Sequence, residues 1–493
     1  MRLIFLIFST LILSVSALYS RKLNVGATQP YATITAAAND ALPGDSIVCH
    51  DAVIKGGMFI ANLQGNANQW IHILVAENIT SIIKGGNNSI QFSDAAYVHL
   101  EGFIIEGQTG NGLNIDDAGS FDTPTHHIRI VNCVFRDIDA TGNNDLLKLS
   151  GLDDFEIKNC TFLNGSIGGS GIDMVGCHRG QIVGNSFKNM GTNSIQAKGG
   201  TADIKIMRNF FENGGTRALN LGGSTGLIYF RPLDATAEAE RIQVIANVIQ
   251  GSEAAVAFVG SRNVEVSNNT ILFPRKWILR ILQETVDTTR FLPCGDNRFY
   301  NNIVIINQNV SVDVNIGPNT APETFTFENN LWWKTSNSSW NGPNLPGQVQ
   351  GSIIADPLII QNSLYQISST SPAIAKGIPY SMTVLDIEGQ AYNDPPSIGA
   401  FEGRKVISAV DDQIQTLINI YPNPTNDILN IKFPNEIIRS IMLYDLDGKL
   451  MSKYQTESNH FEINVHALST GTYILTIIDD NESKVWRKIV VQN

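Results

Sequence analysis

The segment SIQAKGG, residues 194–200, places Lys198 two positions after Gln196 in a stretch where apolar and polar residues alternate. Such alternation is typical of a strand with one buried face, so both polar side chains should point outward together. A lysine can take up a proton when desolvation or neighbouring cations lower its pKa, and an amide beside it can bond to a carboxylate. The pair therefore suits removal of a proton next to a carboxylate group.

The same alternation recurs in LLKLSG, GIDMVGC, ALNLGG, AVAFVGS and WILRILQ. Aligning the six segments gives one column of outward residues: Lys148, Asp173, Gln196, Asn220, Ala257 and Arg280. Neighbouring members should lie about 5 Å apart if the strands are parallel neighbours. A flat polar sheet of this kind suits an extended polysaccharide. Because exposed strands normally carry polar residues, simple solvation of the sheet is an equally open interpretation.

The column and its surroundings supply the candidate site residues. Lys198 and Arg217 are the candidate catalytic residues, with Lys198 as the base. The candidate substrate-binding residues are Lys148, Asp173, Gln196, Asn220, His178, Arg231 and Arg280. The amides would bond the substrate carboxylate, and the cations would supply positive charge near it. No metal ligand is assigned.

Two adjacent carboxylate pairs, Asp116-Asp117 and Asp153-Asp154, raise a hydrolytic alternative. Inverting glycoside hydrolysis uses one carboxylic acid and one carboxylate. Both pairs are expected outside the polar column, in turns, where aspartates mostly stabilise the backbone. Hydrolysis is therefore ranked below proton abstraction.

The six segments belong to a repeat that begins near residue 126. A short apolar strand, an Asn or Cys and a large apolar residue recur, and the Asn/Cys column comprises Cys133, Cys160, Asn185, Asn209, Asn247, Asn269, Asn302 and Asn330. The steps are 22–28 residues, except for 38 from Asn209 to Asn247 and 33 from Asn269 to Asn302. This period predicts a solenoid with one continuous core. The asparagines should form a ladder at a bend, in left-handed backbone, with Cys133 and Cys160 packed as small hydrophobes.

The two long steps contain insertions, residues 224–240 and 283–296, which should form loops on one face of the solenoid. Residues 31–45 predict an amphipathic helix with Ile34, Ala37, Ala38 and Ala41 on one side. This helix resembles the N-terminal cap of secreted right-handed parallel β-helices, and residues 371–377, 385–390 and 397–403 resemble their closing segment. The predicted fold class is all-β, a right-handed parallel β-helix (solenoid) over residues 24–403 with an N-terminal helical cap, followed by a small β-sandwich.

Residues 1–17, MRLIFLIFSTLILSVSA, have the basic start, apolar run and small-residue end of a secretory signal peptide. No later apolar stretch reaches about 18 residues, so no transmembrane segment is expected. The net charge of −12 argues against a nucleic acid partner. The five cysteines lack zinc-type spacing and do not indicate a disulfide framework.

Residues 404–417 are polar and patternless, a predicted linker, and residues 418–493 contain short alternating strands that predict the β-sandwich. YPNPT (421–425), the Asp447-Gly448 turn, LSTGTY (468–473) and KIVV (488–491) resemble the C-terminal sorting domain of type IX secretion. The resemblance implies export through the outer membrane by the type IX machinery, followed by secretion or attachment at the cell surface. A carbohydrate-binding sandwich stays open as an alternative.

The run from residue 194 to residue 223 is similar to the central coils of the chondroitinase B and alginate lyase family. The resemblance implies that Lys198 is the catalytic lysine. The family's catalytic arginine falls on Gly222, and Arg217 stands five residues earlier. The family also implies Ca²⁺, but MGTNS (190–194) has no acidic residue and Asp173 is the nearest candidate.

Together these features predict a secreted, monomeric protein that cleaves an acidic, uronate-containing polysaccharide by β-elimination. Two alternatives stay open. One is a non-catalytic cell-surface protein that binds glycans or serves adhesion, and the other is a polygalacturonase-like glycoside hydrolase.

Overall fold

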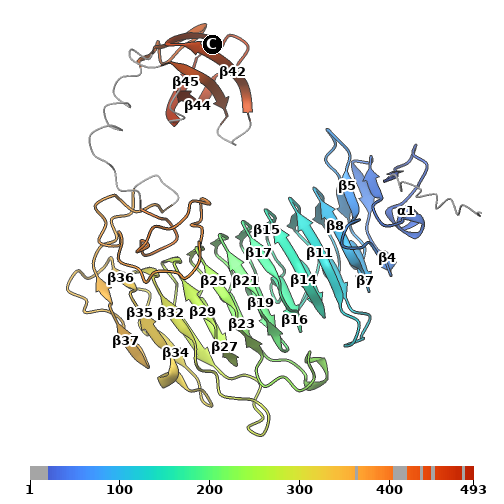
Figure 1. Cartoon of the computed structure of the whole chain (residues 1–493), viewed down its shortest axis with the longest axis vertical. Coiled ribbons are helices and arrows are strands. Elements are labelled where there is room, and N and C mark those ends of the chain that lie inside the picture. The colour runs from blue at the N-terminus through green and yellow to red at the C-terminus, as the bar shows by residue number, and fades with distance from the viewer. Residues whose placement is uncertain are drawn as a thin grey trace, which may run out of the picture. The chain divides into compact units, whose positions relative to one another are not determined.

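The computed structural model describes residues 20–360, 365–403, 419–432, 437–445, 450–479 and 484–492 (Figure 1). The predicted signal peptide (1–17), the predicted linker (404–417) and the predicted Asp447-Gly448 turn lie outside these residues. The chain divides into two compact units, one ending at Gly403 and the other running from residue 404 to residue 493.

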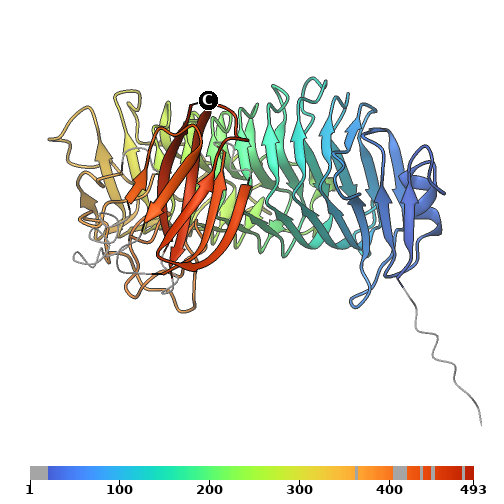
Figure 2. The same ribbon diagram turned by 90° about the horizontal axis from the view of Figure 1, so that it is seen from above.

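The first unit is a parallel β-helix, in which successive coils stack along one axis (Figure 2). Sheet A has 13 strands: β1 Lys22–Val25, β2 Ser46–Cys49, β5 Ile71–Val75, β8 Ala96–Glu101, β11 Thr125–Val131, β14 Leu152–Lys158, β17 Gln181–Val183, β21 Lys205–Met207, β25 Gln243–Ile245, β29 Glu265–Ser267, β32 Arg298–Tyr300, β35 Thr326–Glu328 and β37 Gln348–Gln350. Sheet B has 12 strands: β3 Val53–Lys55, β6 Ile82–Lys84, β9 Ile104–Glu106, β12 Val134–Arg136, β15 Thr161–Leu163, β18 Ser186–Lys188, β22 Phe210–Glu212, β26 Val248–Gln250, β30 Thr270–Leu272, β33 Ile303–Ile306, β36 Leu331–Lys334 and β38 Ile353–Ile354. Sheet C has 10 strands: β4 Met58–Ala61, β7 Ile90–Ser93, β10 Leu113–Asp116, β13 Leu147–Ser150, β16 Ser170–Val175, β19 Asn193–Lys198, β23 Arg217–Gly222, β27 Ala254–Val259, β31 Trp277–Leu282 and β34 Val314–Ile316. The predicted parallel β-helix is thereby confirmed.

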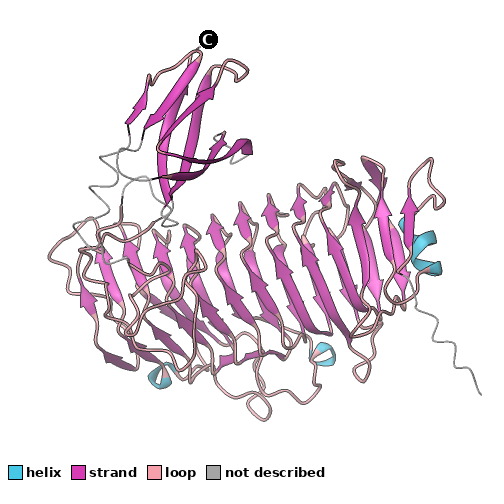
Figure 3. Cartoon of the chain, turned by 45° about the horizontal axis from the view of Figure 1, so that its top comes forward, coloured by secondary structure: helices cyan, strands magenta, loops and turns pink. Residues whose placement is uncertain are grey.

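Helical structure is sparse beside these sheets (Figure 3). A small fourth sheet joins β20 (Thr201–Ala202), β24 (Ala239–Glu240) and β28 (Ser261–Arg262). Two short 3₁₀ turns, η1 (Leu227–Tyr229) and η2 (Pro322–Thr324), lie in loops outside the three long sheets.

The core lies inside the coils and is stacked along the axis. The predicted inward residues of sheet C are all fully buried: Leu147, Leu149, Ile172, Met174, Ile195, Ala197, Leu219, Leu221, Val256, Phe258, Leu279 and Ile281. In sheet B, Phe135, Phe162, Phe187 and Phe211 stack with ring centroids 4.6–4.9 Å apart. Each ring therefore packs against the same residue type one coil away, which holds the strands in register.

The predicted asparagine ladder is present between sheets A and B. It comprises, in order, Asn185, Asn209, Asn247, Asn269, Asn302 and Asn330, all buried. Oδ1 of Asn247 accepts the backbone N–H of Asn209 at 2.8 Å, and its own N–H donates to Asn269 Oδ1 at 2.9 Å. The prediction of left-handed backbone at these asparagines is wrong. The left-handed residue comes one position earlier, as at Arg208 and Ala246 (φ 57° each), because the chain must bend before the amide can point inward.

All five cysteines are buried, and the described residues contain no disulfide. Burial raises the pKa of Cys177 to about 12, so its thiol is not a nucleophile at neutral pH. Cys133 and Cys160 lie in the core, as predicted for small hydrophobes.

The predicted N-terminal cap is a shorter helix than expected. Helix α1 spans Ile34–Asp40, and the Thr33 side chain accepts the Ala36 N–H at 3.1 Å as its N-cap. Ile34, Ala37 and Ala38 are buried against the first coils, whereas Ala41 has extended backbone and ends the helix. The closing segment packs on the outer face of sheet B, where Ile398 and Phe401 join one apolar cluster.

The second unit is a small two-sheet sandwich, as predicted. One sheet contains β39 Asn419–Tyr421, β40 Ile428–Lys432 and β43 His460–Asn464, and the other contains β42 Leu450–Ser458, β41 Ile438–Tyr444, β44 Gly471–Asp479 and β45 Lys484–Val491. Its strands pair antiparallel, and residues such as Leu429, Ile441 and Leu475 form a separate core.

Candidate functional site

The outward residues of sheet C form the predicted column. Strand pairing aligns, in order, Lys148, Asp173, Gln196, Asn220, Ala257 and Arg280. The column also continues beyond its predicted ends, through Asn114 and Gln91 on one side and Asn315 on the other. The alternating LNID of residues 113–116 is the sequence signal for this extension, but it precedes the first repeat motif.

A buried carboxylate joins two lysines at the centre of the column. The Asp173 side chain is 1% exposed, and its Oδ2 contacts the ammonium of Lys148 and lies 3.4 Å from that of Lys198. Asp173 Oδ1 has no hydrogen-bond partner among the described residues. The three predicted site residues are thus brought together, and one carboxylate orients two ammonium groups.

Lys148, Asp173 and Lys198 form a charged centre, and Asp145 also belongs to it. The sequence analysis did not identify Asp145. It lies 3.8 Å from the Lys148 ammonium and accepts the Ser170 N–H at 2.7 Å. Burial, and then the neighbouring Asp173 carboxylate, raise the pKa of Asp145 to about 7. Burial lowers the pKa of Lys148, but the Asp173 and Asp145 carboxylates outweigh it and raise that pKa. Lys148 therefore stays an ammonium at neutral pH.

Both lysines open into one cavity of about 470 Å³. The lining residues are Asp117, Gly119, Phe121, Asn143, Lys148, Ser150, Gly151, Val175, Lys198, Ser224, Thr225, Gly226, Tyr229 and Arg231. The exposed rings of Phe121 and Tyr229 give the cavity apolar surfaces, and charged side chains line it as well. Such a mixture suits a ligand with an apolar face and a negative charge, as in a uronic acid ring.

The first predicted insertion forms one wall of this cavity, and a single buried carboxylate holds it. Glu238 accepts hydrogen bonds from Gly199 N–H at 2.8 Å and from the Thr225 N–H and hydroxyl at 2.9 and 2.7 Å. It also accepts one from Thr285, in the second insertion. Both insertions are therefore fastened to each other and to the end of β19, as predicted for loops on one face.

The prediction that Asp116 and Asp117 lie in turns is wrong for Asp116 and correct for Asp117, whose carbonyl oxygen accepts the Ser120 N–H at 2.9 Å. Asp116 ends strand β10 and pairs with Ser150 of sheet C, and Asp117 follows it into the cavity. A Cβ atom at Gly151 would lie 2.2 Å from Asp117 Oδ2, so the glycine makes room for this carboxyl group. Burial raises the pKa of Asp117. The pair DD resembled a turn because the loop that follows it is rich in polar residues.

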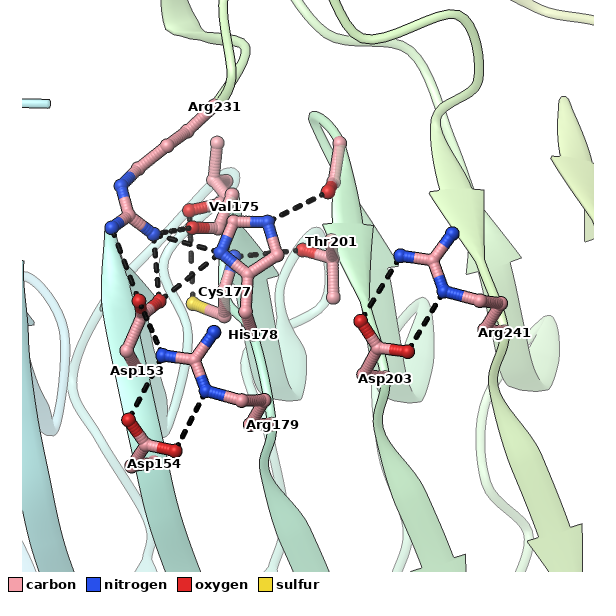
Figure 4. Close-up of polar contacts among 12 residues, drawn as sticks. Asp153, Asp154, Val175, Cys177, His178, Arg179, Thr201, Asp203, Arg231 and Arg241 are labelled. Carbon is pink, nitrogen blue, oxygen red and sulfur yellow. Dashed lines mark hydrogen bonds and ion pairs between the residues drawn. The ribbon is translucent and has the colours of Figure 1, made fainter.

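Asp153 and Asp154 also lie in a strand rather than in a turn. They belong to β14, where Arg179 of the next coil binds Asp154 through two hydrogen bonds of 2.8 and 2.9 Å (Figure 4). Asp153 is buried, and contacts with His178 and Arg231 outweigh burial and hold its pKa well below the usual range. These carboxylates are ion-paired within the fold.

Arg231 and His178, both predicted to bind substrate, meet at Asp153 (Figure 4). Arg231 donates to Asp153 Oδ1 at 2.7 Å and to Gly176 O at 3.2 Å. Nε2 of His178 lies 3.2 Å from Gly200 O, and Nδ1 lies 3.1 Å from Asp153 Oδ1 and 2.8 Å from Nη1 of Arg231. Arg231 reaches the cavity edge, whereas His178 lies outside it. Their polar atoms hold the first insertion against the coils.

Arg217 and Arg280 lie on the outer face of sheet C, beyond the cavity. Arg217 donates to Asn220 Oδ1 at 3.0 Å and to Glu284 at 2.7 Å. Arg280 donates to Asn315 at 3.0 Å and stands 4.5 Å from the centre of the Trp277 ring. Burial, and then the charge of Arg217, lower the pKa of Arg280. Arg280 belongs to the column, whereas Arg217 lies in β23, pairs with Ala254 and is two coils away from Arg280 in β31.

Gly222, where the lyase resemblance expects an arginine, has no room for any side chain. Its φ is +113°, and a Cβ atom there would lie 1.7 Å from the Val259 carbonyl oxygen. The expected arginine is thus excluded by the next coil.

Calcium does not fit the charged centre. The described residues contain no group of three or more His, Cys, Asp or Glu side chains that could hold a metal ion. Asp173, the nearest predicted ligand, is already neutralised by two ammonium groups.

The second unit matches a known family. Residues 419–492 match the family described as the secretion system C-terminal sorting domain. The predicted sorting domain is confirmed, and the chain is exported by the type IX system to the cell surface or the medium. No helix among the described residues is long and apolar enough to span a membrane.

Comparison with solved structures shows the fold of the first unit. The crystal structure of the pectate lyase Pel9A is similar with a TM-score of 0.52 at 14% identity, covering 78% of this chain and 97% of that chain. The PL6 family alginate lyase AlyGC has a TM-score of 0.39 at 13% identity, covering 82% of this chain and 60% of that chain. The GH136 lacto-N-biosidase from Eubacterium ramulus has a TM-score of 0.39 at 11% identity, covering 68% of each chain. No curated protein sequence matches.

Proposed function

We propose that this exported β-helix acts on polysaccharides and cleaves a uronate-containing glycan by β-elimination in the cavity beside Lys198. The observation that carries the proposal is the pair of ammonium groups, Lys148 and Lys198, that share the Asp173 carboxylate and open into one cavity. In a chain with a net charge of −12, such a local positive centre favours a negatively charged ligand. The shared fold with a pectate lyase is consistent with this chemistry.

The two lysines have different roles in this proposal. Lys148 stays charged, because the neighbouring carboxylates raise its pKa, and it neutralises the substrate carboxylate. Negative charge grows on that carboxylate when the adjacent proton leaves, so the ammonium stabilises the transition state more than the ground state. Lys198, in its neutral form, takes the proton.

The rest of the column would bind the polymer beyond the cavity. Gln196 is half-buried on the outer face of sheet C, whereas Asn220 is buried and accepts a hydrogen bond from Arg217. Lys276 and Arg280 lie 4.1 and 4.5 Å from the centre of the Trp277 ring. Arg217 and Arg280 would contact substrate carboxylates there, and a catalytic role for Arg217 stays a prediction. Arg231 and His178 would act by fixing the cavity wall.

The test is incubation of the exported protein with alginate, pectins and glycosaminoglycans, following both ultraviolet absorbance of unsaturated uronate and new reducing ends. We expect both signals with an acidic polymer, neither with a neutral glucan, and loss of both in Lys198→Ala. Reducing ends without the absorbance would instead support a glycoside hydrolase, for which the Asp117 carboxyl in the cavity is the relevant observation. Binding without either signal would support a glycan-binding surface protein.

A further inference from the structure

We propose that Asp117 is the proton donor to the departing glycosidic oxygen, and thus a second catalytic residue beside Lys198. The inference rests on the proposed β-elimination. That reaction needs two proton transfers: a base removes the proton next to the carboxylate, and an acid protonates the oxygen that leaves. The lysines account for the first transfer only.

The position of Asp117 in the fold makes it available for this role. It directly follows the last residue of β10, and its carboxyl group occupies the space that a side chain at Gly151 of the next coil would fill. Oδ1 accepts the Gly119 N–H at 3.0 Å, which fixes the orientation of the group. Asp117 lines the same cavity as both lysines, and its side chain enters from a loop that neither lysine belongs to. An acid, Asp117, and a base, Lys198, therefore face the same cavity from different elements of the fold.

The surroundings of Asp117 favour its protonated form. Burial raises the pKa of the carboxyl group, and the charge of Asp116 acts in the same direction. The Gly119 N–H and the more distant charge of Arg231 act in the opposite direction, without reversing the shift. Lys148 and Lys198, across the cavity, are the other charged groups that face it. A bound uronate would neutralise the Lys148 ammonium charge and so strengthen the preference for the acid form.

The reaction then balances without a further reactant. Lys198 takes the proton from the carbon next to the substrate carboxylate, the carbon–oxygen bond of the glycosidic link breaks, and a carbon–carbon double bond forms. The leaving oxygen takes the Asp117 proton and becomes a hydroxyl group. The enzyme is left with a lysine ammonium and an aspartate anion, and proton exchange with water restores both.

Three other groups are weaker candidates for the donor. Asp173 is bound to two ammonium groups, so it is held as the anion. Asp145 has a raised pKa, but its side chain is 1% exposed and is not among the residues that line the cavity. Tyr229 lines the cavity, but it sits on the turn η1 with 63% of its surface exposed, and no hydrogen bond from another described residue fixes its hydroxyl.

The experiment compares Asp117→Asn with the wild type on two substrates. One is the natural polymer, and the other is a uronate whose leaving group is an acidic phenol, which departs without protonation. We expect kcat on the polymer to fall about 10²–10⁴-fold with little change in KM, and the loss on the phenol substrate to be far smaller. The wild-type rate on the polymer should fall as the pH rises through the raised pKa of Asp117, and that fall should be absent in Asp117→Asn. Asp122→Asn, an exposed aspartate of the same loop, is the matched control.

Each other outcome counts against the proposal. Equal losses on both substrates would assign Asp117 a structural role, and a leaving-group-dependent loss in Tyr229→Phe would move the donor there. If Asp117→Asn does not fold, as judged by thermal unfolding, Asp117→Glu retains the carboxyl group and should keep the fall in rate with rising pH, at a lower kcat. A wild type that is inactive on every acidic glycan overturns the proposed function and this inference together, whereas an active wild type with an unaffected Asp117→Asn overturns this inference alone.

Discussion

The asparagine ladder and the outward column of sheet C are built by the same stacking of coils, yet they differ in how their polar groups are satisfied. In the ladder, each interior residue repeats the same amide, and its oxygen and nitrogen both bond to neighbouring coils. In the column, residue types change from coil to coil, and a buried Asp173 oxygen has no partner among the described residues. Repetition with complete hydrogen bonding indicates structure, whereas variation with unmatched polar groups indicates a site for a ligand.

The largest expected effect comes from the column. Lys198→Ala should lower kcat on the acidic polymer by about 10²–10⁴-fold, because it removes the base. The unfolding midpoint in urea should change little, since Asp173 keeps its contact with Lys148. Activity assays and urea unfolding of the same preparation check the expected loss of kcat and the expected unchanged unfolding midpoint. If Lys198→Ala lost stability and activity in parallel, Lys198 would have a structural role like that of the ladder asparagines, and the contrast between ladder and column would be wrong.

The ladder should respond in the opposite way. Asn247→Ala leaves the Asn209 N–H, the Ile206 carbonyl and other buried groups unpaired. Each buried polar group without a partner costs about 1–3 kcal/mol, so we expect unfolding to become easier by at least about 3 kcal/mol. Catalysis per folded molecule should stay unchanged, because the ladder lies between sheets A and B. Wild-type stability in this variant would mean that the ladder is dispensable.

Much of the fold could be predicted from the sequence because a solenoid repeats its signals. The column from Lys148 to Arg280 and the ladder from Asn185 to Asn330 each follow from one alignment of short strands. The helix α1 was predicted from helical spacing, although its end at Asp40 depends on local backbone geometry.

The site was less predictable because its key groups do not repeat. Asp117 and Asp145 occupy single positions outside the aligned segments. Asp145 is only three residues from Lys148, but its other charged neighbour, Asp173, comes from the next coil, and only the three-dimensional path of the coils brings Asp117 to the same cavity as Lys148. Arg231 has the residue type of a substrate-binding group, yet it is committed to Asp153, a partner 78 residues away. Residue type alone does not distinguish a cation that binds a ligand from one that fastens a loop.

The charged centre predicts a pH dependence of stability. The pKa of Asp145 is about 7 in the folded state, above its ordinary value of 3.8, so the folded state binds more protons than the unfolded state between these values. The contribution of Asp145 to stability is therefore fully present below about pH 4 and is lost as the pH rises toward 7. The slope should be at most about 1.4 kcal/mol per pH unit. Asp145→Asn keeps an acceptor for the Ser170 N–H and should remove this slope, as urea unfolding at pH 5, 6 and 7 would reveal.

The smallest effect on the free energy of unfolding is expected for an ion pair at the solvent-exposed surface. Asp203 and Arg241 form two hydrogen bonds of 2.8 and 3.0 Å, but their side chains are 45% and 51% exposed (Figure 4). Exposed ion pairs contribute about 0–1 kcal/mol, so Asp203→Asn should cost less than about 1 kcal/mol and less still at high salt. A double-mutant cycle with Arg241→Ala, measured by thermal unfolding at two salt concentrations, isolates the pair. A coupling well above 1 kcal/mol that persists at high salt would mean that this surface pair is shielded as Asp153 and Arg231 are. In that case, charges that stabilise the coils could be distinguished from charges that bind a ligand only by whether they line the cavity.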